Sequence, residues 1–199
     1  NERYGDRFLL LHRERRLNPA EGVWMGWERK RGNLTELGRW LRGASDTSFI
    51  AVEGRLPGRV RYVVTVDSDT VLPRESVRRL VGTISHPLNL ARYDPDEGRV
   101  TGGYGILQPR VTPSLPKGDG SSLIQRVYST PRGRDPYAFA VSDVYQDLFD
   151  EGSFAGKGIY DLDVVERVLD GRVPDNTLLS HDLLEGNYAR SGLVTDVEV

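Results

Sequence analysis

The stretch YVVTVDSDTVLP, residues 62–73, runs a series of apolar and β-branched residues directly into two aspartates, Asp67 and Asp69. β-Branched residues bounded by turn residues predict a strand over 60–66 that is buried on both faces. In α/β proteins, ligands gather beyond the carboxyl ends of strands, and residues i and i+2 of an extended chain point to the same side. Two neighbouring carboxylates repel each other unless a cation lies near them, so the stretch predicts a cation site at a strand end.

The residue types available to that site indicate which cation it would bind. The chain has no cysteine, and its three histidines, His12, His86 and His181, are not spaced as a ligand cluster. Oxygen ligands favour a hard divalent ion, Mg²⁺ or Mn²⁺, and such an ion most usefully bridges a diphosphate. A plainer interpretation stays open, because DSDT is also an ordinary turn that caps the helix following it.

Strands and helices alternate on both sides of this stretch. Helical spacing of apolar residues predicts a helix over 33–43, with Asn33 as N-cap and Gly43 as its stop, and a second over 74–84. The alternation predicts an α/β fold, layered, with a mostly parallel central sheet flanked by helices. The other predicted elements are helices over 121–129, 135–149, 162–171 and after 180, strands over 7–13, 99–111 and 193–199, and loops over 18–33, 44–58 and 86–98.

The overall composition predicts a soluble globular protein. Hydrophobic residues make up 38% of the 199 positions, and the mean hydropathy is −0.46. With 27 basic and 29 acidic residues the net charge is −2, which gives no overall attraction to nucleic acid. The sequence contains no run of about 18 apolar residues, the length that would be needed to span a bilayer. The chain starts at Asn1 without a methionine and ends on a strand-like segment, so we expect a one-domain piece of a longer protein.

Two classes of enzyme place D-x-D at the end of a strand. In phosphatases of the haloacid-dehalogenase type the first aspartate is the phosphoryl nucleophile, and VDSDTVL at 66–72 fits their first motif. In nucleotide-sugar glycosyltransferases of the GT-A type the pair holds a metal on the diphosphate. The phosphatase hypothesis also needs a lysine and a second acidic pair, and GDGSS at 118–122 lacks the spaced second aspartate. In a third hypothesis, a non-catalytic saccharide-binding module, Trp24, Trp27 and Trp40 stack on sugar rings, although core packing is the plainer role.

Three further motifs supply groups that a transferase would use. The basic segment that contains Lys30 precedes a predicted helix, where cations and a helix N-terminus can meet phosphate charge together. The glycines of SFAGKGIYD, 153–161, allow a substrate to approach the backbone closely. In LLSHDLLEG, 178–186, Asp182 stands at a predicted helix start, where it can act as a general base or simply cap the helix.

The order of these motifs resembles the core of GT-A glycosyltransferases of the cellulose-synthase-like type. The matching motifs are KRGNL (30–34), VDSD (66–69), LQPRV (107–111), FAGKG (154–158) and SHD (180–182). Longer segments are similar to the glycosyltransferase region of cyclic β-1,2-glucan synthases, and this resemblance covers nearly the whole chain. Those segments are ERKRGNLTEL (28–37), YGILQPRVTPSLP (104–116), DPYAFAVSDVYQDLF (135–149), EGSFAGKGIYD (151–161) and RVPDNTLLSHDLLEG (172–186).

The resemblance implies a role for each matching residue. Asp67 and Asp69 match the pair that holds the metal and the nucleotide sugar, with Asp69 preferred as the direct ligand. Asp182 matches the general base. The other matches are Lys30 facing the diphosphate, Gln108 on the strand that follows, and Phe154, Ala155, Gly156 and His181 near the acceptor.

The resemblance also implies a reaction and a setting. The reaction is the inverting transfer of glucose from UDP-glucose to a growing β-1,2-glucan, with Mg²⁺ or Mn²⁺ as cofactor. The setting is the cytoplasmic face of the bacterial inner membrane, within a longer membrane protein. In that protein, residues 1–199 would form a single, soluble fragment of the glycosyltransferase catalytic domain.

Three departures from the family pattern bear on these expectations. Ser180 and His181 stand where threonine and glutamate usually precede the base. The Q-x-x-R-W motif of processive synthases is absent from the chain. The first nucleotide-binding β-α unit of a GT-A domain would precede residue 1, so we expect the chain by itself to bind UDP-glucose weakly.

Overall fold

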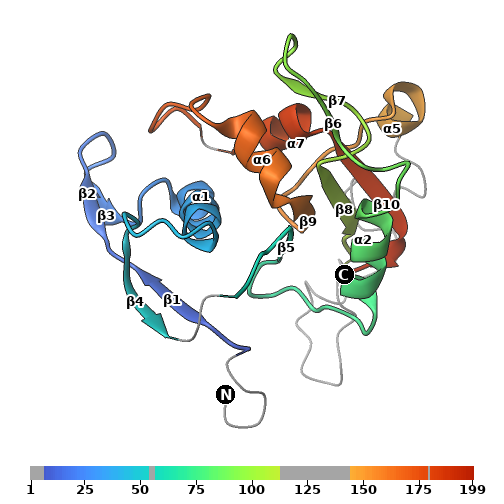
Figure 1. The fold of residues 1–199 in the computed structure, drawn as a ribbon. Coiled ribbons are helices and arrows are strands. Elements are labelled where there is room, and N and C mark those ends of the chain that lie inside the picture. The colour runs from blue at the N-terminus through green and yellow to red at the C-terminus, as the bar shows by residue number, and fades with distance from the viewer. Residues whose placement is uncertain (1–6, 54–56, 113–143, 179) are drawn as a thin grey trace, which may run out of the picture. The chain divides into compact units, whose positions relative to one another are not determined.

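The chain forms two compact units (Figure 1). The first unit comprises Asn1–Arg61 and Leu169–His181, and the second comprises Tyr62–Val168 and Asp182–Val199. The assignment of 1–199 to one catalytic domain stays a prediction. The structure is a computed structural model that describes residues 7–53, 57–112, 144–178 and 180–199.

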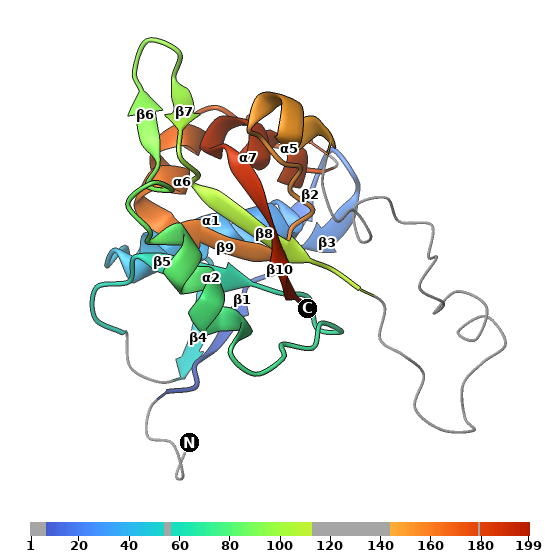
Figure 2. The same ribbon diagram turned by 90° about the vertical axis from the view of Figure 1, so that its right-hand side faces the viewer.

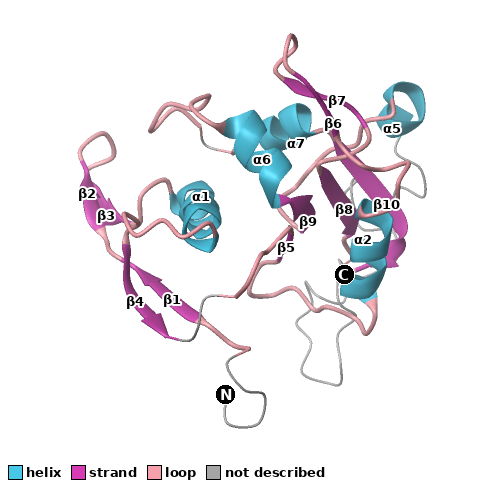
Figure 3. Cartoon of the chain, in the orientation of Figure 1, coloured by secondary structure: helices cyan, strands magenta, loops and turns pink. Residues whose placement is uncertain are grey.

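The first unit contains two antiparallel strand pairs and one helix within its described residues (Figure 3). Strand β1 pairs with β4, and β2 pairs with β3 in a hairpin whose connection includes Gly22 at a φ of +68°. The prediction of loops over 18–33 and 44–58 was therefore wrong at these strands. Strand β4 depends on β1, a partner far away in the chain that local turn residues do not reveal. The elements are β1 (Leu10–Arg13), β2 (Arg16–Asn18), β3 (Val23–Met25), α1 (Arg29–Leu41) and β4 (Phe49–Glu53).

Helix α1 begins earlier than its apolar spacing predicted. Asn33 lies inside the helix, and the N-cap position is taken by Glu28, whose backbone is left-handed at a φ of 50°. The Glu28 carboxylate does not cap the helix. It forms an ion pair with Arg31, whose Nη2 lies 2.7 Å from Glu28 Oε2. The predicted stop is confirmed, because Gly43 adopts a φ of +92° and its N–H donates to the Trp40 carbonyl at 2.9 Å.

The second unit is built on a four-stranded sheet in the order β10-β8-β9-β5 (Figure 2). Strands β10 and β8 are parallel, whereas β9 runs antiparallel to both β8 and β5. The sheet is therefore mixed, which corrects the prediction of a mostly parallel one. Alternation of strands and helices along the sequence does not determine strand direction. The direction depends on which end of the sheet the chain reaches before it enters the next strand. The strands are β5 (Tyr62–Thr65), β8 (Ile106–Arg110), β9 (Gly158–Asp161) and β10 (Ser191–Glu198).

Strand β5 occupies a different position from the one its composition suggested. Among the described strands it pairs with β9 alone, so it forms an edge of this sheet. Three of its four residues are only half-buried, and Thr65 at its end is buried. The expectation of a strand buried on both faces was wrong, because an apolar run reports hydrophobicity and not the number of neighbours in the sheet.

The predicted helices of the second unit are present where the structure describes them. Helices α2 and α6 match the predictions over 74–84 and 162–171, and α7 follows residue 180. The segment 121–129 and most of 135–149 lie outside the described residues, and α5 is the described end of the latter. A β6–β7 hairpin also forms, partly within the predicted loop over 86–98. These elements are α2 (Ser76–Ile84), β6 (Arg92–Asp94), β7 (Arg99–Gly102), α5 (Val144–Phe149), α6 (Leu162–Leu169) and α7 (Asp182–Ala189).

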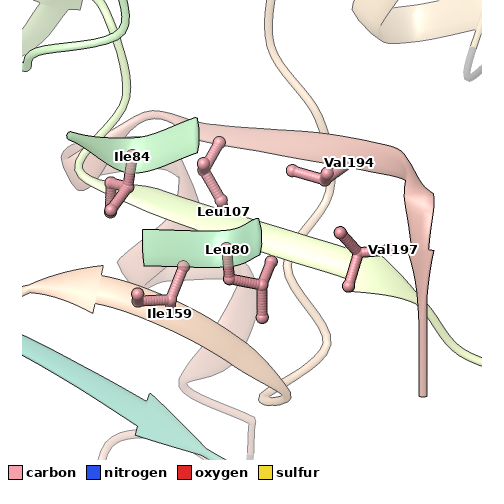
Figure 4. Packing of buried hydrophobic residues seen from close by; sticks show 6 residues of the cluster. All are labelled: Leu80, Ile84, Leu107, Ile159, Val194 and Val197. Carbon is pink, nitrogen blue, oxygen red and sulfur yellow. The ribbon is translucent and has the colours of Figure 1, made fainter. Parts of the chain in front are cut away.

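The core of the second unit lies between helix α2 and the sheet (Figure 4). Leu80 and Ile84 of α2 are buried, whereas Val77 and Val81 of the predicted apolar stripe remain 40% and 36% exposed. The strands contribute Leu107, Ile159, Val194 and Val197. Helix α2 thus packs on one face of this sheet, and the candidate site lies where β5 ends and β9 begins.

The described elements establish an α/β fold with mixed sheets. Layering of the GT-A kind and the absence of a first β-α unit stay predictions. In the part of the chain that the structure describes, no helix has both the length and the apolar composition needed to cross a bilayer.

Candidate active site

The D-x-D motif forms a turn at the end of β5. The backbone N–H of Thr70 donates to the Asp67 carbonyl at 3.0 Å, and the Asp67 N–H donates to Thr70 Oγ1 at 3.2 Å. The interpretation of DSDT as a turn is thus confirmed, whereas its expected role as a helix cap was wrong, because Glu75 occupies the N-cap position of α2. The chain is not extended across the motif, so the argument that residues i and i+2 point to the same side does not apply here. Asp67 is half-buried and Asp69 is exposed.

A lysine from a distant loop neutralises the first aspartate. Lys157 Nζ lies 2.7 Å from Asp67 Oδ2, although the two residues are far apart in the sequence. Lys157 precedes Gly158, which pairs with Thr65 across the β5–β9 ladder. This register brings the loop before β9 to the turn after β5.

The loop before β9, residues 154–158, is held by contacts at each end. Phe154 is 4% exposed, and a Cβ built on Gly186 of α7 would lie 3.0 Å from the Phe154 Cβ, so residue 154 packs closely against that helix. Gln108, 2% exposed on β8, accepts a hydrogen bond from the Ala155 N–H at 2.5 Å. Gln108 is therefore a positioning residue for this loop.

The same loop contacts the predicted general base. A Cβ built on Gly156 would lie 2.8 Å from Asp182 Oδ1 and 3.0 Å from Oδ2, so the carboxylate lies directly on the Gly156 backbone. Gly156 has a φ of +79°, a conformation that favours glycine, and its carbonyl accepts a hydrogen bond from Thr65 Oγ1 at 3.3 Å. A side chain at residue 156 would therefore require the Asp182 carboxylate to move.

Asp182 is the first residue of helix α7. A carboxylate in the first turn of a helix is stabilised by the positive end of the helix dipole. The residue is half-buried, and its Oδ1 atom is shielded from solvent. This shielding suits a carboxylate that exchanges a proton with a bound group, although the dipole interaction alone also explains an aspartate at this position.

The second unit therefore brings together most of the predicted site. Asp67 and Asp182 reach neighbouring residues of one loop, Lys157 and Gly156 respectively. Asp69 lies in the same turn as Asp67. Gln108, Phe154, Ala155 and Gly156 belong to or support the loop. Two predicted site residues belong to the first unit. They are Lys30, the second residue of α1, and His181, which precedes Asp182 in the chain.

Comparison with known proteins then places the chain. No family model matches it. It is 56% identical over 193 residues to the cyclic β-(1,2)-glucan synthase NdvB of Rhizobium meliloti (strain 1021). Over nearly its whole length, the chain corresponds to one segment of a cyclic β-(1,2)-glucan synthase. The aligned stretch covers 97% of this chain and 7% of that synthase, so the chain spans a small part of its relative's length.

The donor atoms at the turn fit a hard cation. Asp67 and Asp69 provide carboxylate oxygens, the ligand type that Mg²⁺ and Mn²⁺ prefer. The Lys157 ammonium already lies beside one oxygen of Asp67, so this carboxylate is paired with a positive charge. The residues present therefore fit a divalent ion.

The sequence analysis did not identify Lys157. Lys157 lies in the motif FAGKG, whose glycines predicted a role for the loop's backbone and not for the lysine side chain. A lysine flanked by two glycines, in a loop predicted to contact substrate, was the signal available. Its partner could not be found without the pairing of β5 with β9.

Proposed function

We propose that the chain forms part of the catalytic site of an inverting glucosyltransferase that extends β-1,2-glucan from UDP-glucose. The supporting observation is the loop over 154–158, which contacts the predicted base Asp182 and the predicted metal ligand Asp67 at neighbouring residues. The 56% identity to a cyclic β-(1,2)-glucan synthase supports the same assignment. The donor, the acceptor and the metal are proposals for this chain.

Asp182 acts as the general base in this proposal. Its carboxylate accepts the proton of the acceptor's 2-hydroxyl while that oxygen attacks the anomeric carbon of the donor. The bond from this carbon to the UDP oxygen breaks, and its electron pair leaves with the diphosphate. Attack from the face opposite to the leaving group converts the α-linked donor into a β-linked product.

Asp67 and Asp69 hold the divalent cation. When bound, Mg²⁺ or Mn²⁺ supplies positive charge that stabilises the diphosphate as it leaves. Asp69 is exposed and Asp67 is half-buried, so the turn can present both carboxylates to an ion from solution. Lys30 lies on the first unit, and its role toward the diphosphate stays a prediction from the resemblance.

The remaining residues orient the acceptor. The Gln108 side chain accepts a hydrogen bond from the Ala155 N–H, and Phe154 packs against α7. Ala155 is exposed, so a sugar ring can lie against it. His181 is half-buried beside Asp182 in sequence, and we assign it to the acceptor side of the base.

The partners follow from this chemistry. The acceptor is a β-glucan, the donor is UDP-glucose, and the remainder of a longer synthase would supply the other parts of the site. We place that synthase at the cytoplasmic face of the bacterial inner membrane. The small share of the relative that this chain covers, 7%, agrees with a catalytic site completed by other segments.

One observation favours a phosphatase of the haloacid-dehalogenase type as the second candidate. Such an enzyme needs a lysine beside its nucleophilic aspartate, and Lys157 lies 2.7 Å from Asp67. The identity to a glucan synthase favours the transferase. Hydrolysis of p-nitrophenyl phosphate that is lost in Asp67→Asn would establish the phosphatase instead.

The transferase is tested by metal-dependent release of UDP from UDP-glucose in the presence of a β-glucan acceptor. Asp182→Asn should lower the rate by about a hundredfold or more, because a general base contributes that much, and should leave UDP binding unchanged. Asp163→Asn is the matched control, since Asp163 is an exposed aspartate in the first turn of α6. If calorimetry detects no Mn²⁺-dependent UDP binding, even for a chain extended at its N-terminus, the transferase proposal is rejected.

A further inference from the structure

Lys157 forms an ion pair whose two side chains remain accessible to solvent. Its Nζ lies 2.7 Å from Asp67 Oδ2, with the lysine and aspartate side chains 24% and 40% exposed. Ion pairs with this degree of exposure contribute little free energy, because water screens the charges and the long side chain loses conformational entropy. A competing ion can therefore separate the pair at small cost.

The backbone around Lys157 is fixed independently of that ion pair. Gly158 pairs with Thr65 in the β5–β9 ladder and lies too close to the Leu107 carbonyl for any side chain. Gly156 is held by Asp182 and by the hydrogen bond from Thr65. The lysine side chain can thus leave Asp67 while the loop keeps its place.

We infer that the Lys157 ammonium is an exchangeable counter-ion that occupies the Asp67 carboxylate until a divalent cation replaces it. An ammonium and a divalent ion cannot both contact the same carboxylate oxygen without strong mutual repulsion. Cation binding therefore moves the lysine side chain out of the turn. The displaced ammonium stays on the 154–158 loop, where it can form an ion pair with an anionic diphosphate. This inference rests on the metal site of the proposed function.

The first test measures Mn²⁺ affinity with Mn²⁺ alone as the probe, by calorimetry and by the loss of the electron paramagnetic resonance signal of unbound Mn²⁺. Lys157→Met should bind Mn²⁺ about two- to fivefold more tightly than the unaltered 199-residue chain, because the competing charge is gone. Asp67→Asn should abolish binding at this site. Equal or weaker binding by Lys157→Met overturns the inference.

Arg110→Met is the matched control for charge. Arg110 pairs with Glu198 at 2.6 Å, and the two side chains are 30% and 49% exposed, close to the values for the Lys157–Asp67 pair. This variant removes one positive charge from the same unit without touching the turn. Its Mn²⁺ affinity should equal that of the unaltered chain. A gain as large as that of Lys157→Met would show a general charge effect and overturn the inference.

A second test needs no variant at Lys157. Acetylation of lysine amines with a water-soluble reagent, followed by peptide mass spectrometry, should be faster at Lys157 once Mn²⁺ is present, because the displaced amine is more accessible. The same measurement on Asp67→Asn is the reference, and Mn²⁺ should leave the reactivity of Lys157 unchanged in that variant. If Mn²⁺ binds through Asp67 and Lys157 reactivity stays constant, the inference fails while the proposed metal site stands. If no variant binds Mn²⁺, the metal site and the inference both fail, and UDP release then tests the transferase separately.

Discussion

The backbone of Gly156 and the carboxylate of Asp182 are in direct contact, since a Cβ at residue 156 would lie 2.8 Å from Asp182 Oδ1. Gly156→Ala should therefore strain the backbone at a φ of +79° and displace the carboxylate. The left-handed conformation alone costs about 1–2 kcal/mol for an alanine. We expect a larger loss in the free energy of unfolding, measured by urea denaturation, because the clash adds to this cost.

Gly171→Ala separates the two effects. Gly171 has a similar φ of +65°, but a Cβ added there would meet no atom within 4 Å. This variant should show the backbone cost without the clash. If both variants lose the same free energy of unfolding, the contact between residue 156 and Asp182 is not restrictive.

Gln108→Leu should loosen the 154–158 loop. The substitution removes the acceptor for the Ala155 N–H, now 2.5 Å from Gln108 Oε1, at an expected cost of about 1–3 kcal/mol if the N–H finds no other partner. Hydrogen exchange at the Ala155 amide should become faster than in the unaltered chain. Unchanged protection of this amide would show that Gln108 does not hold the loop.

Helix α2 should depend on Leu80 far more than on Val77. Leu80 is fully buried against the sheet, so Leu80→Ala should lower the free energy of unfolding by about 2–5 kcal/mol through lost burial and the cavity it leaves. Val77 is 40% exposed on the same helix, and Val77→Ala should cost less than about 1 kcal/mol. Thermal and urea unfolding of both variants measures the difference. Similar losses would contradict the packing shown in Figure 4.

Tyr160 should make stability fall at alkaline pH. Burial raises the pKa of its phenol above the ordinary value of 10.0, and the Glu185 carboxylate raises this pKa further. The folded chain thus holds the proton more tightly than the unfolded chain does. This contribution is fully present below pH 10.0 and is lost as the pH rises toward the folded-state pKa.

The measurement compares urea midpoints of the unaltered chain and Tyr160→Phe at about pH 8 and about pH 11. The variant should lose less stability over this range, because phenylalanine has no proton to release. Tyr145→Phe is the control, since Tyr145 is 51% exposed. An equal decline in the unaltered chain and Tyr160→Phe would show that the Tyr160 proton does not contribute.

The sequence by itself determined the local elements and the residues with functional chemistry. The apolar spacing over 74–84 identified α2, Gly43 marked the end of α1, and the β-branched run before Asp67 identified β5. These features depend on neighbours within a few residues, because helix periodicity, strand composition and glycine conformation are local properties. The motifs that contain Asp67, Gln108 and Asp182 could be recognised for the same reason.

Only the tertiary structure decided which of those residues meet. The antiparallel direction of β9, the edge position of β5 and the pairing of Thr65 with Gly158 follow from how the chain returns over long distances. That pairing places Lys157 on Asp67, and helix α7 brings Asp182 to Gly156. The contacts between the β5 and β9 segments join residues about 90 positions apart, as in the hydrogen bond from Thr65 to Gly156, and no local pattern encodes them.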